Sequence, residues 1–413
     1  TAVDGTIGIG AEALASLTVG AQNVAIGYEA LEELTEGYNN VALGYQAGTS
    51  ISSTTSTDNT IIGDRAGTGG SGVMAYCTAI GSGALNGTGT RNSTMNTAIG
   101  MNSMGGTFGG TVNYNTAVGG NTMTGALNAA TYNVALGYTA LGSLTTGDYN
   151  VAVGYNAGNA MTTTTDTVLI GGLAGDAINS ADADGTVAIG KNALTALTDG
   201  QYNTAIGWGA LSANKQNDHN TAVGYRALTA YSASSAGTGG NTAVGSWCGD
   251  SVTTGVSNTL LGFYAGQAIT TGNYNNFMGA QAGHKTTTGG YNVSIGMESS
   301  YHNEAGSFNT VMGHKAGQYM TGMEAGKGSQ TSAPYSSAGN NVAVGQYALN
   351  EVTTGGTNVA IGNRALLSLE HGTQSTAVGY GAGYYATGSE NTFLGFNAGY
   401  GGTSSAPHSS GER

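Results

Sequence analysis

The sequence predicts an all-β fold, a parallel β-solenoid or β-roll of about 22 turns, and three observations carry this prediction. A phrase of polar, small, aliphatic and glycine residues recurs 22 times in 413 residues, mostly at steps of 17. Glycine is abundant, with 74 copies against 2 prolines, and charged residues make up only 8% of the chain. Large residues such as leucine and small residues such as alanine and glycine also alternate between neighbouring repeats, which indicates that these repeats are in contact. A period this constant is typical of stacked repeat units.

Each repeat is predicted to form a coil of about 17 residues with one or two short strands joined by turns. The representative phrases Asn23–Gly27, Asn203–Gly207 and Asn358–Gly362 alternate β-branched and small residues, which is typical of a strand. Glycine recurs too often for a helix. Thr-Thr-Gly segments such as 270–272 predict a turn in which glycine supplies a left-handed conformation. Seventeen of the 22 phrases begin with asparagine, which predicts a ladder of side-chain amides.

A volume rule links each repeat to the next. We name the residue two before the repeat glycine the small position, and the residue four after it the switch position. Eleven repeats have Leu or Met at the switch, and in all eleven the next repeat has alanine at its small position. Six repeats with a large residue at the small position follow a Gly or Ser switch. Close packing requires one large group per shared site. Representative pairs are Leu14 with Ala25, Gly48 with Ile61, Gly266 with Phe277, and Gly383 with Phe393.

Residues 1–402 are therefore expected to form one solenoid, roughly 105 Å long at about 4.8 Å per turn, and residues 403–413 an irregular tail. The spacing nearly doubles between Gly313 and Gly345, which predicts an insertion loop over residues 318–340. Loops on rigid scaffolds often carry recognition, and a degenerate repeat is the alternative. The candidate recognition residues of this loop are Met320, Met323, Glu324, Lys327, Pro334 and Tyr335. Shorter expansions lie at 50–58, 69–76, 105–113 and 231–240.

Composition argues against several classes of function. A net charge of −13 with ten scattered Lys and Arg residues disfavours nucleic acid. No apolar run approaches the length of a membrane span. Cys77 and Cys248 are nine repeats apart and are expected to be buried free thiols.

We expect no enzyme activity and no metal or cofactor. The histidines lack metal-ligand spacing, although His284, His302 and His314 lie in neighbouring repeats and a shared metal is the alternative to solvated loop histidines. The acidic pair Glu32-Glu33 is interpreted as solubilising.

An apolar stripe predicts association along the chain. The aliphatic residue before each glycine is often followed, just after the glycine, by an aromatic residue, and the chain has few charges. These aromatic residues include Tyr28, Tyr45, Tyr138, Tyr155, Trp208, Tyr225, Phe263, Tyr380 and Phe396.

The phrases at 23–30 and 358–365 resemble the head repeats of trimeric autotransporter adhesins, whose hallmark is N-x-V-A-I-G-x-x-A. Residues 220–228 (NTAVGYRAL) are similar to repeats of bacteriophage tail fibres, and the 17-residue period favours the fibre. The resemblance implies a parallel homotrimer on a virion or cell surface.

We therefore expect an extracellular structural shaft for host attachment, most of all part of a phage tail fibre. Its expected partners are two more copies of the chain, a cell-surface glycan or protein receptor, and other virion or fibre proteins at its ends. A bacterial adhesin head and a self-assembling filament are the alternatives. An ice- or glycan-binding module ranks lower, because Thr residues are expected beside the core phrase or in turns rather than in an outward array.

Overall fold

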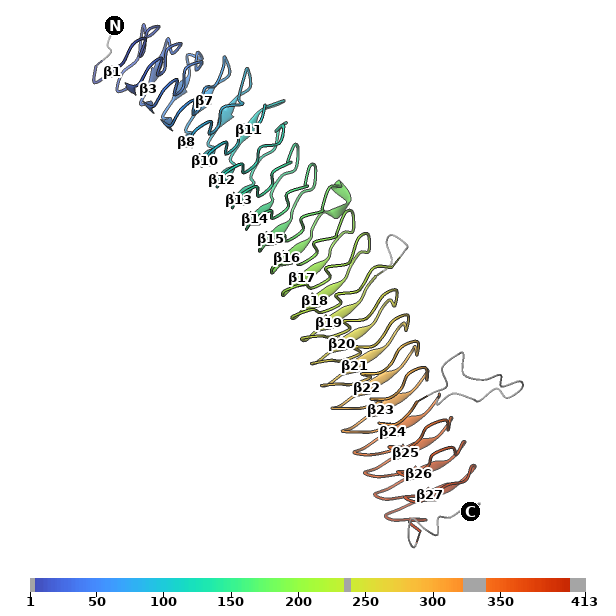
Figure 1. The fold of residues 1–413 in the computed structure, drawn as a ribbon. Helices are drawn as coiled ribbons and strands as arrows, with labels where there is room; N and C mark the ends of the chain where they lie inside the picture. Colours follow the sequence, from blue (N-terminus) through green and yellow to red (C-terminus); the bar gives the residue numbers. More distant parts are fainter. Residues whose placement is uncertain (1–3, 234–238, 322–338, 402–413) are drawn as a thin grey trace. The chain divides into compact units, whose positions relative to one another are not determined.

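The computed structural model describes residues 4–233, 239–321 and 339–401, and it confirms the parallel β-solenoid of about 22 turns. The chain divides into two compact units, residues 1–203 and 204–413. Each unit repeats the same turn: one three-residue strand, the repeat glycine, and a chain of tight turns that returns to the next strand (Figure 1). The predicted five-residue strand is thus three residues long, and each strand ends directly before its glycine.

Unit 1 contains eleven strands of the long sheet, each paired in parallel with the next along the chain. These are β1 (Ile7–Ile9), β2 (Val24–Ile26), β4 (Val41–Leu43), β6 (Thr60–Ile62), β8 (Thr78–Ile80), β10 (Thr97–Ile99), β12 (Thr116–Val118), β13 (Val134–Leu136), β14 (Val151–Val153), β15 (Val168–Ile170) and β16 (Val187–Ile189). Each residue of one strand faces its equivalent in the next, as Ala25 faces Ala42.

Three of the predicted expansions in unit 1 contribute to a second, smaller sheet. Its five parallel strands lie in consecutive turns and are paired in chain order. They are β3 (Gly37–Tyr38), β5 (Ser56–Thr57), β7 (Met74–Ala75), β9 (Ser93–Thr94) and β11 (Val112–Asn113). A later turn of this unit contains η1 (Ala181–Ala183), the one helix of the described residues. The extra residues of long turns therefore form structure of their own.

Unit 2 contains the other eleven strands of the long sheet, again paired in parallel with each residue facing its equivalent. They are β17 (Thr204–Ile206), β18 (Thr221–Val223), β19 (Thr242–Val244), β20 (Thr259–Leu261), β21 (Asn276–Met278), β22 (Val293–Ile295), β23 (Thr310–Met312), β24 (Val342–Val344), β25 (Val359–Ile361), β26 (Thr376–Val378) and β27 (Thr392–Leu394). The insertion between Gly313 and Gly345 leaves the pairing of β23 with β24 unchanged.

The repeat glycine is required by backbone geometry. Gly262 has φ +137°, and a β-carbon there would lie 2.6 Å from the carbonyl oxygen of Gly279 in the next turn. The Thr-Thr-Gly glycines are different, and the prediction of a left-handed glycine is wrong there. Gly272 has no positive φ, and its missing side chain instead gives room to the carbonyl of Gly289. The left-handed residue of that turn is Tyr274, two positions later.

The predicted asparagine ladder is present and buried. Asn40 donates from its backbone N to Asn23 Oδ1 at 3.0 Å and from Nδ2 to the same oxygen at 3.1 Å. Its Nδ2 also donates to the carbonyl of Ser56 at 3.2 Å. The amide of Asn40 therefore bonds to the preceding turn and to its own turn, which satisfies its buried polar atoms. In unit 2 the ladder runs through every turn from Asn220 to Asn358.

The six representative repeat residues share this geometry. Asn23, Asn203 and Asn358 are fully buried, and Gly27, Gly207 and Gly362 have φ values of +140°, +135° and +136°.

The volume rule corresponds to a shared space in the core. A β-carbon at Gly48 would lie 2.8 Å from Leu31 Cδ2 and 3.3 Å from Ile61 Cδ1, so side chains of both neighbouring turns fill this space. At Gly383 the equivalent distances are 2.6 Å to Phe393 Cδ2 and 2.8 Å to Leu366 Cδ2.

For two of the representative pairs, Gly266 with Phe277 and Leu14 with Ala25, the nearest contacts are to other residues. The atoms nearest to Gly266 belong to Ile269 and Leu260, and the ring of Phe277 lies against Gly283 of its own turn. Leu14 Cδ1 lies 3.7 Å from the place of a β-carbon on Gly8, also in its own turn, and Ala25 is buried in the next.

These contacts add a condition that the sequence analysis missed. A large residue at the small position contacts the switch of its own turn, and four of the six also contact the switch before it: Ile61, Leu169, Leu260 and Phe393. All six turns with a large residue there indeed have glycine at their own switch: Gly67, Gly175, Gly266, Gly283, Gly317 and Gly399.

Candidate functional site

The outward face of the long sheet is the most uniform surface of each unit. In the long-sheet strands from β2 to β27 the middle residue is buried in the core and the residues on either side of it point outward, whereas the middle residue of β1 is the exposed Gly8. The outward residue directly before the repeat glycine is Ile, Val, Leu or Met in all eleven strands of each unit. The other outward residue is Val, Ile or Thr, with one Asn, so neither row contains a charge.

This face is exposed within a single chain. Leu261, Met278 and Ile361 are 43, 44 and 41% exposed, although long apolar side chains are usually buried. A soluble monomer seldom leaves so regular an apolar row in water. The face therefore has the character of an interface.

The nine predicted aromatic residues just after the repeat glycine are also exposed. Neighbouring rings stack from turn to turn, with centroids 5.4 Å apart for Tyr28 and Tyr45 and 5.2 Å apart for Trp208 and Tyr225. This row adjoins the aliphatic row, because one glycine separates the two residues in sequence.

A hollow of about 240 Å³ opens on the outward face of unit 2. Its lining comes from three consecutive strands, β20, β21 and β22. The lining residues are Thr259, Asn276, Phe277, Met278, Val293 and Ile295.

A second set of aromatic columns was missed from the sequence. Tyr114, Tyr132 and Tyr149 stack with centroids 4.8 and 5.1 Å apart. Tyr274, Tyr291 and Phe308 stack at 4.9 and 5.0 Å. Each ring belongs to the residue before the ladder asparagine, and each has φ between +58° and +61°. The recurring dipeptide Tyr-Asn is the signal that would have revealed these columns.

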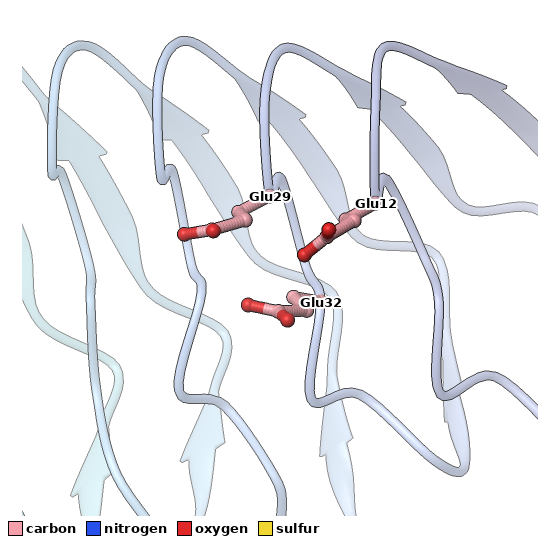
Figure 2. Close-up of side chains that lie close together, drawn as sticks. All are labelled: Glu12, Glu29 and Glu32. Carbon is pink, nitrogen blue, oxygen red and sulfur yellow. The ribbon is translucent and has the colours of Figure 1, made fainter.

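Three carboxylates meet in unit 1, at the start of the described chain. Glu12 follows the first repeat glycine, and Glu29 and Glu32 follow the second; Figure 2 shows that their side chains lie close together. One oxygen of each lies within 4.8 Å of the others. Carboxylate oxygens at such spacing can ligate a hard divalent cation. Of the acidic pair interpreted as solubilising, Glu32 is half-buried and faces the like charges of Glu12 and Glu29, whereas Glu33 is exposed.

Hydrogen bonds and desolvation set the charges in this cluster. Hydrogen bonds from Tyr28 and from Gln46 Nε2, at 2.7 Å, lower the pKa of Glu29. The same contact with Glu29 raises the pKa of Tyr28 to about 12. Desolvation, followed by the charges of Glu29 and Glu12, raises the pKa of Glu32.

The three candidate histidines do not meet. Within the described residues, the one group of three metal-ligating side chains is the glutamate cluster. His284 stacks on Tyr301 at 4.9 Å, and His302 stacks on Tyr319 at 5.2 Å. His314 instead meets the edge of Tyr347 at 5.6 Å. Burial lowers the pKa of both His284 and His302, which favours their neutral forms.

The two cysteines are buried and free, as predicted. Cys77 takes the place of a ladder asparagine, and its Sγ lies 3.3 Å from the carbonyl oxygen of Ser93. Burial raises the pKa of the Cys248 thiol to about 12, so this thiol stays protonated.

The candidate recognition residues fall in two places. Met320 is completely buried in the core of unit 2, beside Val311 and Ala343, so it belongs to the solenoid turn rather than to a recognition surface. Met323, Glu324, Lys327, Pro334 and Tyr335 lie outside the described residues, as does the predicted tail from 403.

A scan against protein-family models and a search of curated proteins find no match for this chain. In the part of the chain that the structure describes, no helix has the length and hydropathy needed to cross a bilayer. The proposal for function therefore rests on the solenoid and its surfaces.

Proposed function

We propose that the chain is the shaft of an extracellular fibre, in which copies of the solenoid associate in parallel through the outward face of the long sheet. The observation that carries this proposal is the outward row of aliphatic residues, eleven in each unit, which itself contains no charge. Burying the exposed half of one such side chain contributes about 1 kcal/mol. Association along a stack of turns repeats that contribution at every turn.

The proposed assembly has three copies around a threefold axis parallel to the stack of turns. Such symmetry gives every copy two neighbours and closes the assembly, so the apolar rows meet without growing further. The number three also agrees with the resemblance of the repeats to trimeric adhesins and tail fibres. In this proposal the role is mechanical: the shaft holds binding sites away from a virion or cell and lets weak contacts with a surface glycan or protein act together.

The mass of the native protein in solution tests the assembly. Sedimentation equilibrium is expected to give three times the chain mass of 40.8 kDa at micromolar concentration. Replacing Leu261 and Met278 by lysine should reduce this mass, because it places charges in the apolar row. Replacing Tyr274, which is exposed on a different row, by lysine is the matched control and should leave the mass unchanged. A wild-type chain that sediments as a monomer contradicts the proposal.

Attachment is tested by shortening the long insertion. Deleting residues 323–337 restores a spacing of 17 between Gly313 and Gly345 and keeps the core residue Met320. We expect an unchanged melting curve and weaker binding to the target surface. Unchanged binding removes this segment from the attachment function.

Ice binding is a second candidate, because the expectation that Thr residues form no outward array is wrong. Threonine does point outward, in runs of four consecutive strands: Thr60, Thr78, Thr97 and Thr116 in unit 1, and Thr204, Thr221, Thr242 and Thr259 in unit 2. An assay of ice recrystallisation would detect this activity at micromolar protein. Replacing Thr221 and Thr242 by lysine should then abolish it, and crystals that grow as in buffer exclude it.

A further inference from the structure

The outward face is so regular that it does not fix the alignment of two copies. Each strand presents one aliphatic residue in the same place, and each turn follows its neighbour in the same register. When one copy slides along another by one turn, aliphatic residues still meet aliphatic residues. Regular pairing surfaces of this kind are prone to slip unless a distinct residue marks one position.

One residue of this face is distinct. Asn276 is the first residue of β21, where the other 21 strands of the long sheet have Val, Ile or Thr. Its side chain is exposed, and within the described residues the amide makes no hydrogen bond. It lines the hollow between β20 and β22, next to Met278 and Ile295. A lone amide in an apolar row is the feature that would specify an alignment.

We propose that Asn276 fixes the register in which copies of this chain associate, by hydrogen bonding to Asn276 of a second copy; this inference rests on the proposed function. A side-chain amide is self-complementary, since it has donors on its nitrogen and an acceptor oxygen. In register, the amides of the copies lie at one height and pair within the hollow. After a slip of one turn, each amide faces Thr259 or Val293 of the neighbour and loses that symmetric pairing. A single buried asparagine selects register in coiled coils in the same way.

The occupant of the hollow is a second copy for two reasons. The face carries no charge that a charged or polar ligand could use, in contrast to the glutamate cluster of unit 1. Its apolar side chains recur once per turn, and another stack of the same turns presents apolar side chains at the same spacing. The hollow, about 240 Å³, has room for the ends of amide side chains.

Disulfide mapping between copies tests this inference on the full chain. Two variants, Val344→Cys and Ile361→Cys, place a thiol on the outward face of β24 and β25, one turn apart. They are mixed, unfolded, refolded together and oxidised, and the linked peptides are counted by mass spectrometry. With Asn276 present, same-position links should exceed neighbour-position links at least about tenfold, because disulfides tolerate little displacement.

The variant Asn276→Val should lower this ratio at least about fivefold, as slipped alignments become populated and satisfy the disulfide geometry at neighbouring positions. Its melting curve should stay near that of the wild type, because Val occupies this place in other strands. Thr310→Val, the same type of change on β23, is the matched control and should leave the ratio unchanged. Adding Val293→Asn to Asn276→Val moves the amide by one turn in every copy and should restore the ratio.

An unchanged ratio in Asn276→Val overturns the inference while the proposed association stands. Loss of association in that variant also overturns it, because alignment rather than affinity should depend on the amide. A monomeric wild-type chain overturns the proposed function and this inference with it.

Discussion

The turns between Gly44 and Gly137 in unit 1 and those between Gly245 and Gly313 in unit 2 produce the same strand from different lengths of chain. The first have 18 or 19 residues, and the second have 17. The extra residues of the long turns supply β5, β7, β9 and β11, whereas three of the four short turns return through Thr-Thr-Gly and the fourth through Glu-Ala-Gly at 304–306. The repeat glycines recur in both regions, and so does the asparagine ladder, which is interrupted once, by Cys77, in the first region. The ladder asparagine and the repeat glycine, which flank the strand, therefore fix the register of neighbouring turns. The number of residues can vary in the rest of the turn.

The repeat glycines should show the largest effect, and it should be equal in the two regions. Gly262→Ala combines a positive φ of +137° with a β-carbon 2.6 Å from the carbonyl of Gly279, and Gly81→Ala meets Gly100 in the same way. We expect each to cost about 4 kcal/mol of unfolding free energy in urea, the sum of backbone strain and overpacking. Gly209→Ala, with φ +65° and open space around it, should cost only about 1 kcal/mol. A much smaller loss of unfolding free energy for Gly81→Ala than for Gly262→Ala would show that the repeat glycine does not have the same role in the two regions.

Core volume should give the next effect, in the short-turn region. Gly283→Leu forces a side chain into the ring of Phe277 and should cost about 3 kcal/mol. Adding Phe277→Ala recreates the natural combination of Ala205 and Leu211 and should recover most of the loss. The coupling energy of this double-mutant cycle, measured by urea unfolding, is expected near 2 kcal/mol. Additive costs would mean that the two positions do not share space.

The asparagine ladder should contribute less per residue. Asn258→Ala removes the acceptor of the backbone N of Asn275 and the donor to the carbonyl of Gly272, which should cost about 2 kcal/mol. Asn258→Thr should cost less, because Thr167 donates its hydroxyl to a ladder oxygen at 2.7 Å. The same pair of substitutions at Asn115, in the long-turn region, should give matching values by thermal and urea unfolding.

The glutamate cluster should show the smallest effect and a dependence on pH. Because the folded state raises the pKa of Glu32, the protein binds this proton more tightly than the unfolded chain does, and ionisation costs stability as pH rises through the folded pKa. Glu32→Gln should therefore raise the melting temperature at pH 7, and the gain should vanish below the ordinary value of 4.5. Glu36→Gln, an exposed glutamate outside the cluster, is the control. Equal shifts in both variants would point to net charge alone.

Much of the fold could be predicted from the sequence because the core rows repeat at fixed distances from the glycine. Asparagine four residues before the glycine predicted the ladder, and alanine two residues before it predicted the packed interior; Asn40 and Ala25 are examples. The two-residue strands β5, β7, β9 and β11 could not be located in this way, since their pairing depends on neighbouring turns being long together. The glutamate cluster was also hidden, because Glu12 and Glu29 lie 17 residues apart and meet only when two turns stack.

The most direct test of the proposed association is the reactivity of methionines toward hydrogen peroxide in the native protein. Met278 and Met312 lie in the outward aliphatic row and are 44 and 40% exposed in a single chain, whereas Met95, 48% exposed, lies on the row before the ladder asparagine. Oxidation of methionine follows its exposure. If copies associate through the sheet face, peptide mass spectrometry should show Met95 oxidised well before Met278 and Met312. Equal rates at all three residues would contradict the association.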